Sequence, residues 1–411
     1  MLNSLPPDRR RQAALVIVVA ALGYFVDIYD LLLFGMVRNA SLLGIGVPAA
    51  DLLSRGVLLL NMQMGGMLVG GVLWGILGDK RGRLSVLFGS IVLYSLANLG
   101  NGLATTLGQY AALRFLAGVG LAGELGAGIT LVAEIMPKES RGWGTSIVAA
   151  VGICGAVVGY FVADLAPWRT AYFIGGGLGL LLLGLRVGVV ESGMFRRAAA
   201  EHPRRGDFMM LFNDRRRFVK YLRIIAIGVP LWYLVGILVL FSPELGRAIG
   251  LPQAPAAGRA VALCYTGLAI GDLASGAISQ WLRSRRRAVW GFMAAQWLGT
   301  AFYFMGGGSS PLAFDAACLT LGLAGGYWAL FVTIGAEQFG TNIRATVATT
   351  VPNMVRGATV PMTLAFEALK PALGLAGSAL AVGVVVFALA AWGLAGLEET
   401  FHKDLDYVER T

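Results

Sequence analysis

The sequence predicts an all-α polytopic membrane protein, with twelve transmembrane helices in two pseudo-symmetric six-helix halves. Three observations predict this fold class: an apolar composition, apolar runs that recur along the whole chain, and an internal repeat. Of the 411 residues, 57% are hydrophobic and only 14% are charged, which is more apolar than a soluble domain of this length requires. Glycine is abundant as well, at 58 residues, as in membrane helices whose backbones approach closely.

Twelve apolar runs are long enough to cross a bilayer. The first, from Ala13 to Val37, is too long for the apolar core of a cleavable signal peptide, and more runs follow it. One long polar stretch, 191–223, follows the sixth run, so we expect it to link an N-terminal bundle (1–190) to a C-terminal bundle (224–411). The expected crossings are 13–37, 56–78, 84–105, 109–135, 144–165, 170–190, 224–242, 260–281, 288–306, 311–336, 346–369 and 374–396.

The basic residues predict the orientation of these crossings. Twelve crossings place both termini on one side, and 24 of the 33 Lys and Arg residues fall in the termini and loops of that side, against six on the other. The excess of basic residues in cytoplasmic loops therefore predicts two cytoplasmic termini. The same asymmetry explains the net charge of +10 without a nucleic-acid partner. Short outer loops without a large external domain favour a bacterial inner membrane.

An internal repeat relates the two halves. The fourth run contains GLAGE (120–124) and exits through EIMPKESR (134–141), while the tenth contains GLAGG (322–326) and exits through EQFGTNIR (337–344). Both exits place an arginine seven residues after a glutamate. Two six-helix halves with weak similarity are typical of transporters that rock around a site at the membrane midplane.

Several motifs resemble one transporter family. GILGDKRGR (75–83) resembles the loop between helices two and three of the major facilitator superfamily. The segment 114–142 is similar to the fourth helix of its sugar-porter and metabolite:proton symporter branches. DIYD (27–30) is similar to the D-x-x-D of its aromatic-acid:proton symporters, and VESGMF (190–195) resembles the end of the sixth helix, with Gly193 where proline is usual. The resemblance implies a twelve-helix fold and alternating access.

Four acidic residues inside the predicted crossings are candidates for proton coupling, namely Asp27, Asp30, Glu124 and Asp272. Asp27 and Asp30 are three residues apart, so they are expected to share a helix face. Two close carboxylates in a low dielectric do not both ionise easily, which suits a proton carrier. Asp27 is the deeper of the two and the stronger candidate. The alternative for each of the four is structural: a hydrogen bond or an ion pair between helices.

Basic and aromatic residues at similar depth are candidates for binding the substrate. Arg356 is bracketed by Pro352 and Pro361, and Asn353 lies one turn earlier on the same helix face. Arg356 can clamp a carboxylate, or it can be a permanent counter-ion for Asp272 or another acid. Arg114 lies about 15 Å along the helix from Glu124, too far to pair with it, and is expected to meet Asp27 or Asp30. The candidate aromatic wall consists of Tyr29, Trp232, Tyr233, Tyr327 and Trp328, for which helix packing is the alternative.

Charges at the ends of the predicted helices are candidates for gating. Asp79 follows the small-residue row of the second crossing and can cap a helix or pair with the other half. Arg83, Glu134 and Arg141 are expected to complete that charge network, with Glu337 and Arg344 as its mirror in the second half.

The leading functional hypothesis is proton-coupled symport of a small organic anion, an aromatic acid or a short monocarboxylate. The alternatives are a proton-coupled exporter of drugs or cations, and a porter for sugars or polyols. We expect a monomer in the bilayer that is not an enzyme and needs no cofactor. The three cysteines form no metal-binding pattern, and no phosphate-binding loop appears. A channel would need a ring of like charges, and a receptor would need an output domain; we find neither in the sequence.

Overall fold

The computed structural model describes residues 7–81, 83–124, 141–186, 208–340 and 343–401, together with 126, 128 and 132. Within these residues the regular structure is helical, without a β-strand. The N-terminal half consists of α1 (Pro7–Gly44), α2 (Leu52–Arg81), α3 (Arg83–Leu103), α4 (Leu107–Leu121), α6 (Arg141–Leu165) and α7 (Trp168–Arg186). In this half α1 packs on α6, α2 on α4 and α3 on α7.

The first helix of the C-terminal half begins before the predicted seventh crossing. Helix α9 starts at Arg215 rather than at 224, because the Asp214 carboxylate caps it by accepting a 2.8 Å hydrogen bond from the backbone N–H of Arg217. The rest of this half consists of a π-helical extension of α9 (Leu234–Val239), α10 (Ser242–Ala248), α11 (Ala257–Trp281), α12 (Arg285–Met305), α13 (Pro311–Gly325), α14 (Trp328–Glu337), α15 (Arg344–Gly357) and α16 (Thr359–Ala395). Helix α16 kinks at Gly374, whose φ of 67° is one that glycine adopts readily.

Eight stretches of the described chain are helical, long and apolar enough to cross a membrane: Ala14–Gly44, Ala49–Gly78, Ser85–Leu103, Trp168–Leu185, Arg215–Val239, Ala257–Trp281, Pro311–Glu337 and Thr346–Ala395. The last contains the kink at Gly374 and so covers both the eleventh and the twelfth predicted crossing. The described parts of the three other predicted crossings are also helical. The fourth crossing is described in part and contains α4, the fifth corresponds to α6, whose apolar stretch is the shorter Val151–Leu165, and the ninth corresponds to α12. The arrangement agrees with twelve crossings.

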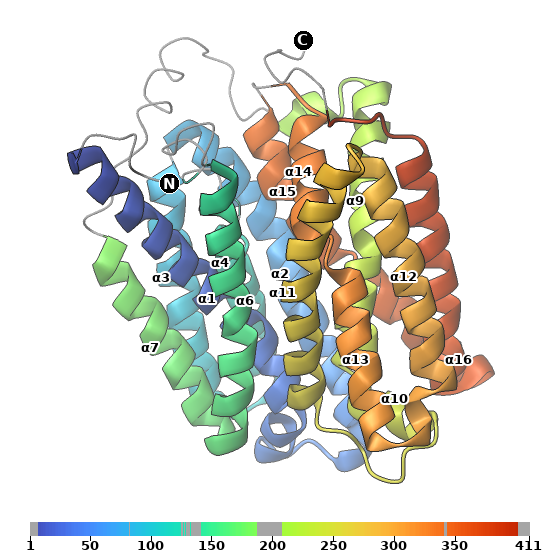
Figure 1. Cartoon of the computed structure of the whole chain (residues 1–411). Helices are drawn as coiled ribbons and strands as arrows, with labels where there is room; N and C mark the ends of the chain where they lie inside the picture. Colours follow the sequence, from blue (N-terminus) through green and yellow to red (C-terminus); the bar gives the residue numbers. More distant parts are fainter. Residues whose placement is uncertain are drawn as a thin grey trace.

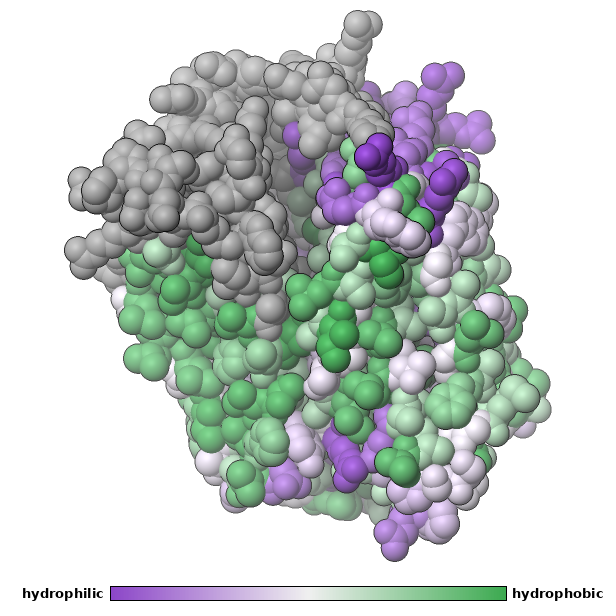
Figure 2. Space-filling model, viewed as in Figure 1, coloured by the Kyte–Doolittle hydropathy of each residue, from purple (hydrophilic) through white to green (hydrophobic). Residues whose placement is uncertain are grey.

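The two halves stand side by side and meet along their length (Figure 1). Contacts between α2 and α15 and between α6 and α11 join them. Helix α1 begins and α16 ends at the same end of the bundle (Figure 1). The flank of the molecule is a broad apolar band, and hydrophilic residues gather at the end where α9 and α12 begin (Figure 2).

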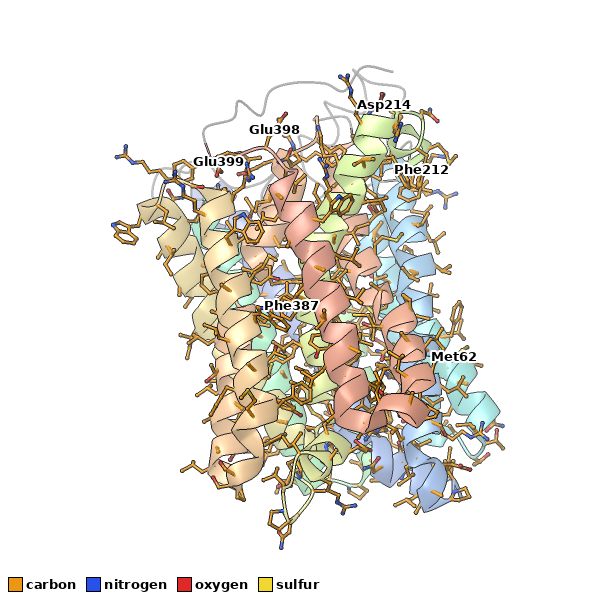
Figure 3. All side chains as sticks on the ribbon, turned by 90° about the vertical axis from the view of Figure 1, so that its right-hand side faces the viewer. Met62, Phe212, Asp214, Phe387, Glu398 and Glu399 are labelled. Carbon is orange, nitrogen blue, oxygen red and sulfur yellow. The ribbon has the colours of Figure 1, made fainter. Side chains whose placement is uncertain are left out.

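At that end a short segment after α16 contacts the bundle, and Glu398, Glu399 and Asp214 all lie near this end (Figure 3). Glu399 accepts hydrogen bonds from the Ser284 hydroxyl and, at 2.9 and 3.2 Å, from the backbone N–H groups of Arg285 and Arg286. Partial burial alone would raise the pKa of Glu399, but these donors at the start of α12 outweigh it and lower the pKa. The carboxylate thus caps α12 and holds the chain end in place.

Candidate functional site

A small cavity lies between the two halves, at the level of the buried charges of α1 and α15. Its volume is about 30 Å³, so it can hold water but not an organic ligand. The N-terminal half contributes Tyr24, Ile28, Leu31 and Ile153 to its lining, and the C-terminal half contributes Leu231, Trp232, Val235, Tyr265, Leu268, Trp328 and Arg356. The lining is therefore mainly aromatic and aliphatic, with one cation.

An ion pair across the two halves borders this cavity. The Arg356 Nη2 of α15 lies 3.6 Å from the Asp27 Oδ2 of α1, and both side chains are almost fully buried, at 2% and 0% exposure. The guanidinium carbon lies 5.9 Å from the ring centre of Trp328 and 6.0 Å from that of Trp232, within reach of cation–π attraction. Neither carboxylate oxygen of Asp27 has a hydrogen-bond partner among the described residues. A buried pair with so few hydrogen bonds is open to a competing ligand.

Asp30 points elsewhere, into the N-terminal half. A Cβ placed on Gly175 of α7 would collide with its Oδ1, so the carboxylate packs directly against that helix. Arg114 acts on Asp30 electrostatically, but it donates its hydrogen bond to Gln63 and lies 4.8 Å above the Phe34 ring. The two aspartates were expected to share one helix face, but their side chains contact different helices. Three residues leave an offset of about 60° around a helix, enough to direct Asp27 toward α15 and Asp30 toward α7.

Two other buried polar candidates, Glu124 and Asn353, do not line the cavity and are held by hydrogen bonds. Glu124 is 3% exposed and accepts a 2.9 Å hydrogen bond from Ser90 within the N-terminal half. Asn353 donates to the Ala122 carbonyl at 2.9 Å and thereby links α15 to the other half. The roles predicted for both residues stay predictions.

Asp272 lies beside a break between α13 and α14, after Gly326. Its Oδ1 accepts a 3.1 Å hydrogen bond from the backbone N–H of Ala329, one of the donors that the first turn of α14 leaves unpaired. A Cβ on Gly326 would collide with the backbone of Gly271, so α11 and the break touch directly. This placement favours the structural alternative, in which Asp272 caps a broken helix next to Trp328.

Replacing Asp272 with asparagine is expected to leave proton-driven uptake within about twofold of the wild type, because the amide oxygen can still cap α14. Asp272→Leu removes the acceptor and should cost about 1 kcal/mol of stability, seen as a lower melting temperature of the purified protein. If the well-folded Asp272→Asn variant loses accumulation against a gradient, Asp272 carries a proton and the capping interpretation fails.

Three of the predicted wall residues do not reach the cavity. The hydroxyl groups of Tyr29, Tyr233 and Tyr327 donate to the backbone carbonyls of Ala171, Ala379 and Ile227, each within its own half. Among the described residues of the cavity lining, Trp232, Trp328 and Arg356 are those that the sequence singled out.

Tyr24 and Tyr265 also line the cavity, and they were missed. Tyr24, Ile28 and Leu31 recur at the i, i+4, i+7 spacing of one helix face, and this spacing was the signal that could have identified Tyr24.

The gating candidates are placed in part. Glu337 forms two hydrogen bonds with the Arg285 guanidinium, at 3.0 and 3.1 Å, and accepts a third from Thr400 at 2.6 Å. Arg344 donates to the carbonyls of Ala336 and Phe339 at the end of α14. The side chains of Asp79, Arg83, Glu134 and Arg141 lie outside the described residues. The ion-pair partner described for Glu337 is thus Arg285 of α12, and not the predicted Arg344.

Comparison with known proteins identifies relatives over most of the chain. The family model described as Major Facilitator Superfamily matches residues 13–358. A probable 4-methylmuconolactone transporter of Cupriavidus pinatubonensis is 26% identical over 92% of this chain and 89% of its own length. The 3-(3-hydroxy-phenyl)propionate transporter of Escherichia coli is 30% identical over 58% of this chain and 62% of its own. The xylose transporter of E. coli, solved in a partially occluded inward-open conformation, superposes with a TM-score of 0.71 at 18% identity, covering 96% of this chain and 100% of that one, and so shares the fold.

Proposed function

The chain belongs to the major facilitator superfamily, and we propose that it carries a small organic acid together with a proton by alternating access. The substrate class is an aromatic acid or a short monocarboxylate. The observation that carries this proposal is the buried Asp27–Arg356 pair between the halves, bordered by aromatic rings. The substrates named for its relatives, a muconolactone and a hydroxyphenyl acid, support the same class. A chain of this family is a transporter and not an enzyme.

Competition for one guanidinium couples the proton to the substrate. While Asp27 is ionised it occupies Arg356, and an incoming carboxylate meets a partner that is already taken. Protonation of Asp27 removes the competing charge, so the planar fork of Arg356 is free to bind the acid. Trp232, Trp328 and Tyr265 then pack against its apolar part. One proton and one monoanion enter together, so the loaded site gains no net charge.

The halves must separate before a ligand fits, because the cavity holds only about 30 Å³. Rocking about the contacts of α2 with α15 and of α6 with α11 would open one side at a time. On the orientation given by the basic residues, both termini lie in the cytoplasm. We propose a monomer in the bacterial inner membrane, with protons and the small acid as its partners.

The two other functions considered from the sequence fit this cavity less well. A sugar or polyol needs hydrogen-bonding groups, and the described lining contains no Asn, Gln, Ser or Thr side chain. A cation exporter needs a free acid in the cavity, whereas Asp27 is paired with Arg356 and Asp272 caps α14.

Uptake into proteoliposomes tests the function directly. With an acidic exterior, labelled 4-hydroxybenzoate should accumulate about tenfold per unit of pH difference, because that gradient supplies about 1.4 kcal/mol per proton. Protein-free liposomes measure passive entry, and xylose and a lipophilic cation serve as alternative substrates. Uptake of the acid that ignores the gradient, or faster transport of either alternative substrate, would contradict the proposal.

A further inference from the structure

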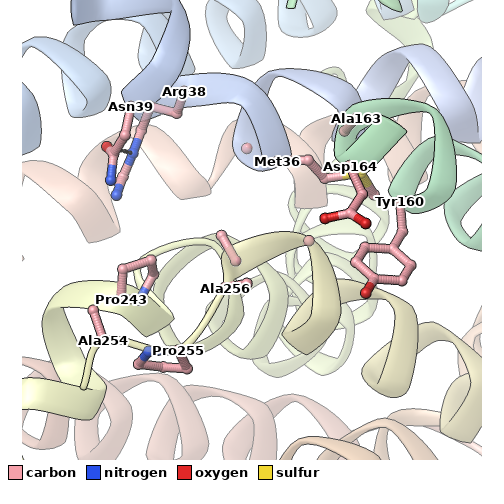
Figure 4. Close-up of a pocket in the computed structure, with 13 residues that line it drawn as sticks. Met36, Arg38, Asn39, Tyr160, Ala163, Asp164, Pro243, Ala254, Pro255 and Ala256 are labelled. Atoms are coloured by element: carbon pink, nitrogen blue, oxygen red, sulfur yellow. Dashed lines mark hydrogen bonds between the residues drawn. The ribbon is translucent and has the colours of Figure 1, made fainter. Parts of the chain in front are cut away.

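A second and larger cavity lies between the halves (Figure 4). It is at the end of the bundle opposite the one where α1 begins and α16 ends (Figure 1). Its volume is about 260 Å³, close to the lower end of the range of roughly 300–1,000 Å³ found for small-molecule sites. Helices α1 and α6 line it from the N-terminal half, and Pro243 and the segment leading into α11 line it from the C-terminal half. On the proposed orientation this cavity faces the outside.

A buried cation forms one end of this cavity. The Arg38 side chain is only 3% exposed, and its Nη2 pairs with Glu244 of α10, across the halves. Its Nε donates to Asn39 at 3.2 Å, and its guanidinium carbon lies 4.7 Å above the Phe241 ring. The Arg38 Nη1 and the Glu244 Oε2 each have no hydrogen-bond partner in the described part of the chain. Leaving a buried charged donor unused is costly, so Arg38 retains capacity for a further anion.

The opposite end of the cavity is acidic. Figure 4 shows Asp164 and Tyr160 of α6 on one side of the cavity and Arg38 with Asn39 on the other. Asp164 is exposed and forms no ion pair among the described residues. Apolar side chains also line the cavity: Met36 lies beside Asp164, and Ala256 lies between the two ends. The cavity therefore offers a cation, an apolar middle and a hydrogen-bond acceptor, in that order.

We propose that this cavity is an entry site for a hydroxylated aromatic acid. The carboxylate of the acid competes with Glu244 for Arg38, its ring lies over the apolar middle, and its hydroxyl donates to Asp164. The inference rests on the proposed function, because it takes the ligand from the transported class. The Arg38–Glu244 pair joins the halves at this end, so an acid that displaces Glu244 also loosens the contact that keeps the outer side closed.

Equilibrium dialysis of the purified full-length Arg356→Gln variant tests the site, with labelled 4-hydroxybenzoate and benzoate as probes. This variant lacks the central carboxylate partner, so the remaining binding reports the outer cavity. We expect saturable binding of both acids, with 4-hydroxybenzoate about tenfold tighter because its hydroxyl donates to a carboxylate. Asp164→Ala should erase that preference and leave benzoate binding unchanged. Asp164 is exposed, so its replacement does not endanger folding.

Two substitutions at the cationic end should act in opposite directions. Arg38→Gln should abolish binding of both acids, whereas Glu244→Gln removes the competitor and should tighten both severalfold. The second variant keeps Arg38 in place and so remains informative if Arg38→Gln does not fold. Arg247→Gln, an exposed position on the same helix as Glu244, serves as the charge-matched control and should change nothing.

Three results would overturn the entry site: no saturable binding to the Arg356→Gln variant, equal affinity for the two acids, or weaker binding after Glu244→Gln. None of them bears on proton-coupled uptake by the wild-type protein. The proposed function and the entry site can therefore fail separately.

Discussion

Replacing Arg356 with glutamine is expected to abolish proton-driven uptake of organic acids at micromolar substrate. Truncating one partner of a buried charge pair costs roughly 2–5 kcal/mol, so the apparent KM should rise by about 30-fold or more. The loss is specific to this arginine because its guanidinium borders the central cavity between Trp232 and Trp328. Initial rates of 4-hydroxybenzoate uptake in proteoliposomes measure it.

Two further arginine substitutions sharpen this experiment. Arg356→Lys keeps the charge but loses the planar fork, so its KM should lie between those of the wild type and Arg356→Gln. Arg259 is exposed and pairs with Asp315 at 2.6 Å, and Arg259→Gln should transport normally. Wild-type kinetics in a folded Arg356→Gln protein would mean that Arg356 is a permanent counter-ion for Asp27 and not a substrate clamp.

The fold could be predicted from the sequence to a large extent, because a membrane crossing leaves a pattern within one short stretch of sequence. Each crossing needs about 20 apolar residues, and that demand is visible in any window of the chain. The breaks were not visible. The interruption between α13 and α14 depends on Gly326 touching Gly271 and on a cap from Asp272, 57 residues before Ala329. Such contacts join distant segments and leave no local pattern.

For the candidate site, the sequence predicted how deep in the membrane each side chain lies, but not which neighbouring helix it contacts. Asp27, Arg356 and Trp328 were found because buried charges and aromatic residues at mid-span are costly or conspicuous. Tyr29 sits at the same depth as Asp27, yet its hydroxyl turns to the Ala171 carbonyl inside its own half. The residue number gives the position of a side chain along its helix, whereas the packing of the helices determines which neighbour it contacts. The same limit hid Arg38, whose partner Glu244 lies 206 residues away.

Asp27→Asn is expected to separate exchange from accumulation. Asparagine resembles the protonated aspartic acid in shape and charge, so Arg356 stays free for the substrate and exchange without a gradient should continue at a rate near that of the wild type. Accumulation driven by a pH gradient should disappear, because no proton moves with the acid. The wild-type KM should fall as the pH falls, since substrate binding takes up a proton, and the KM of the variant should not depend on pH.

Asp30→Asn is the matched partner of this variant, with the same chemistry one helical turn away. Asp30 faces α7 and Arg114 instead of Arg356, so its replacement should leave the competition for Arg356 intact. We therefore expect Asp30→Asn to keep gradient-driven accumulation and to change mainly the transport rate, through the position of Arg114. The reverse result, with accumulation lost in Asp30→Asn and kept in Asp27→Asn, would place the proton inside the N-terminal half. The central ion pair would then serve only to hold the two halves together.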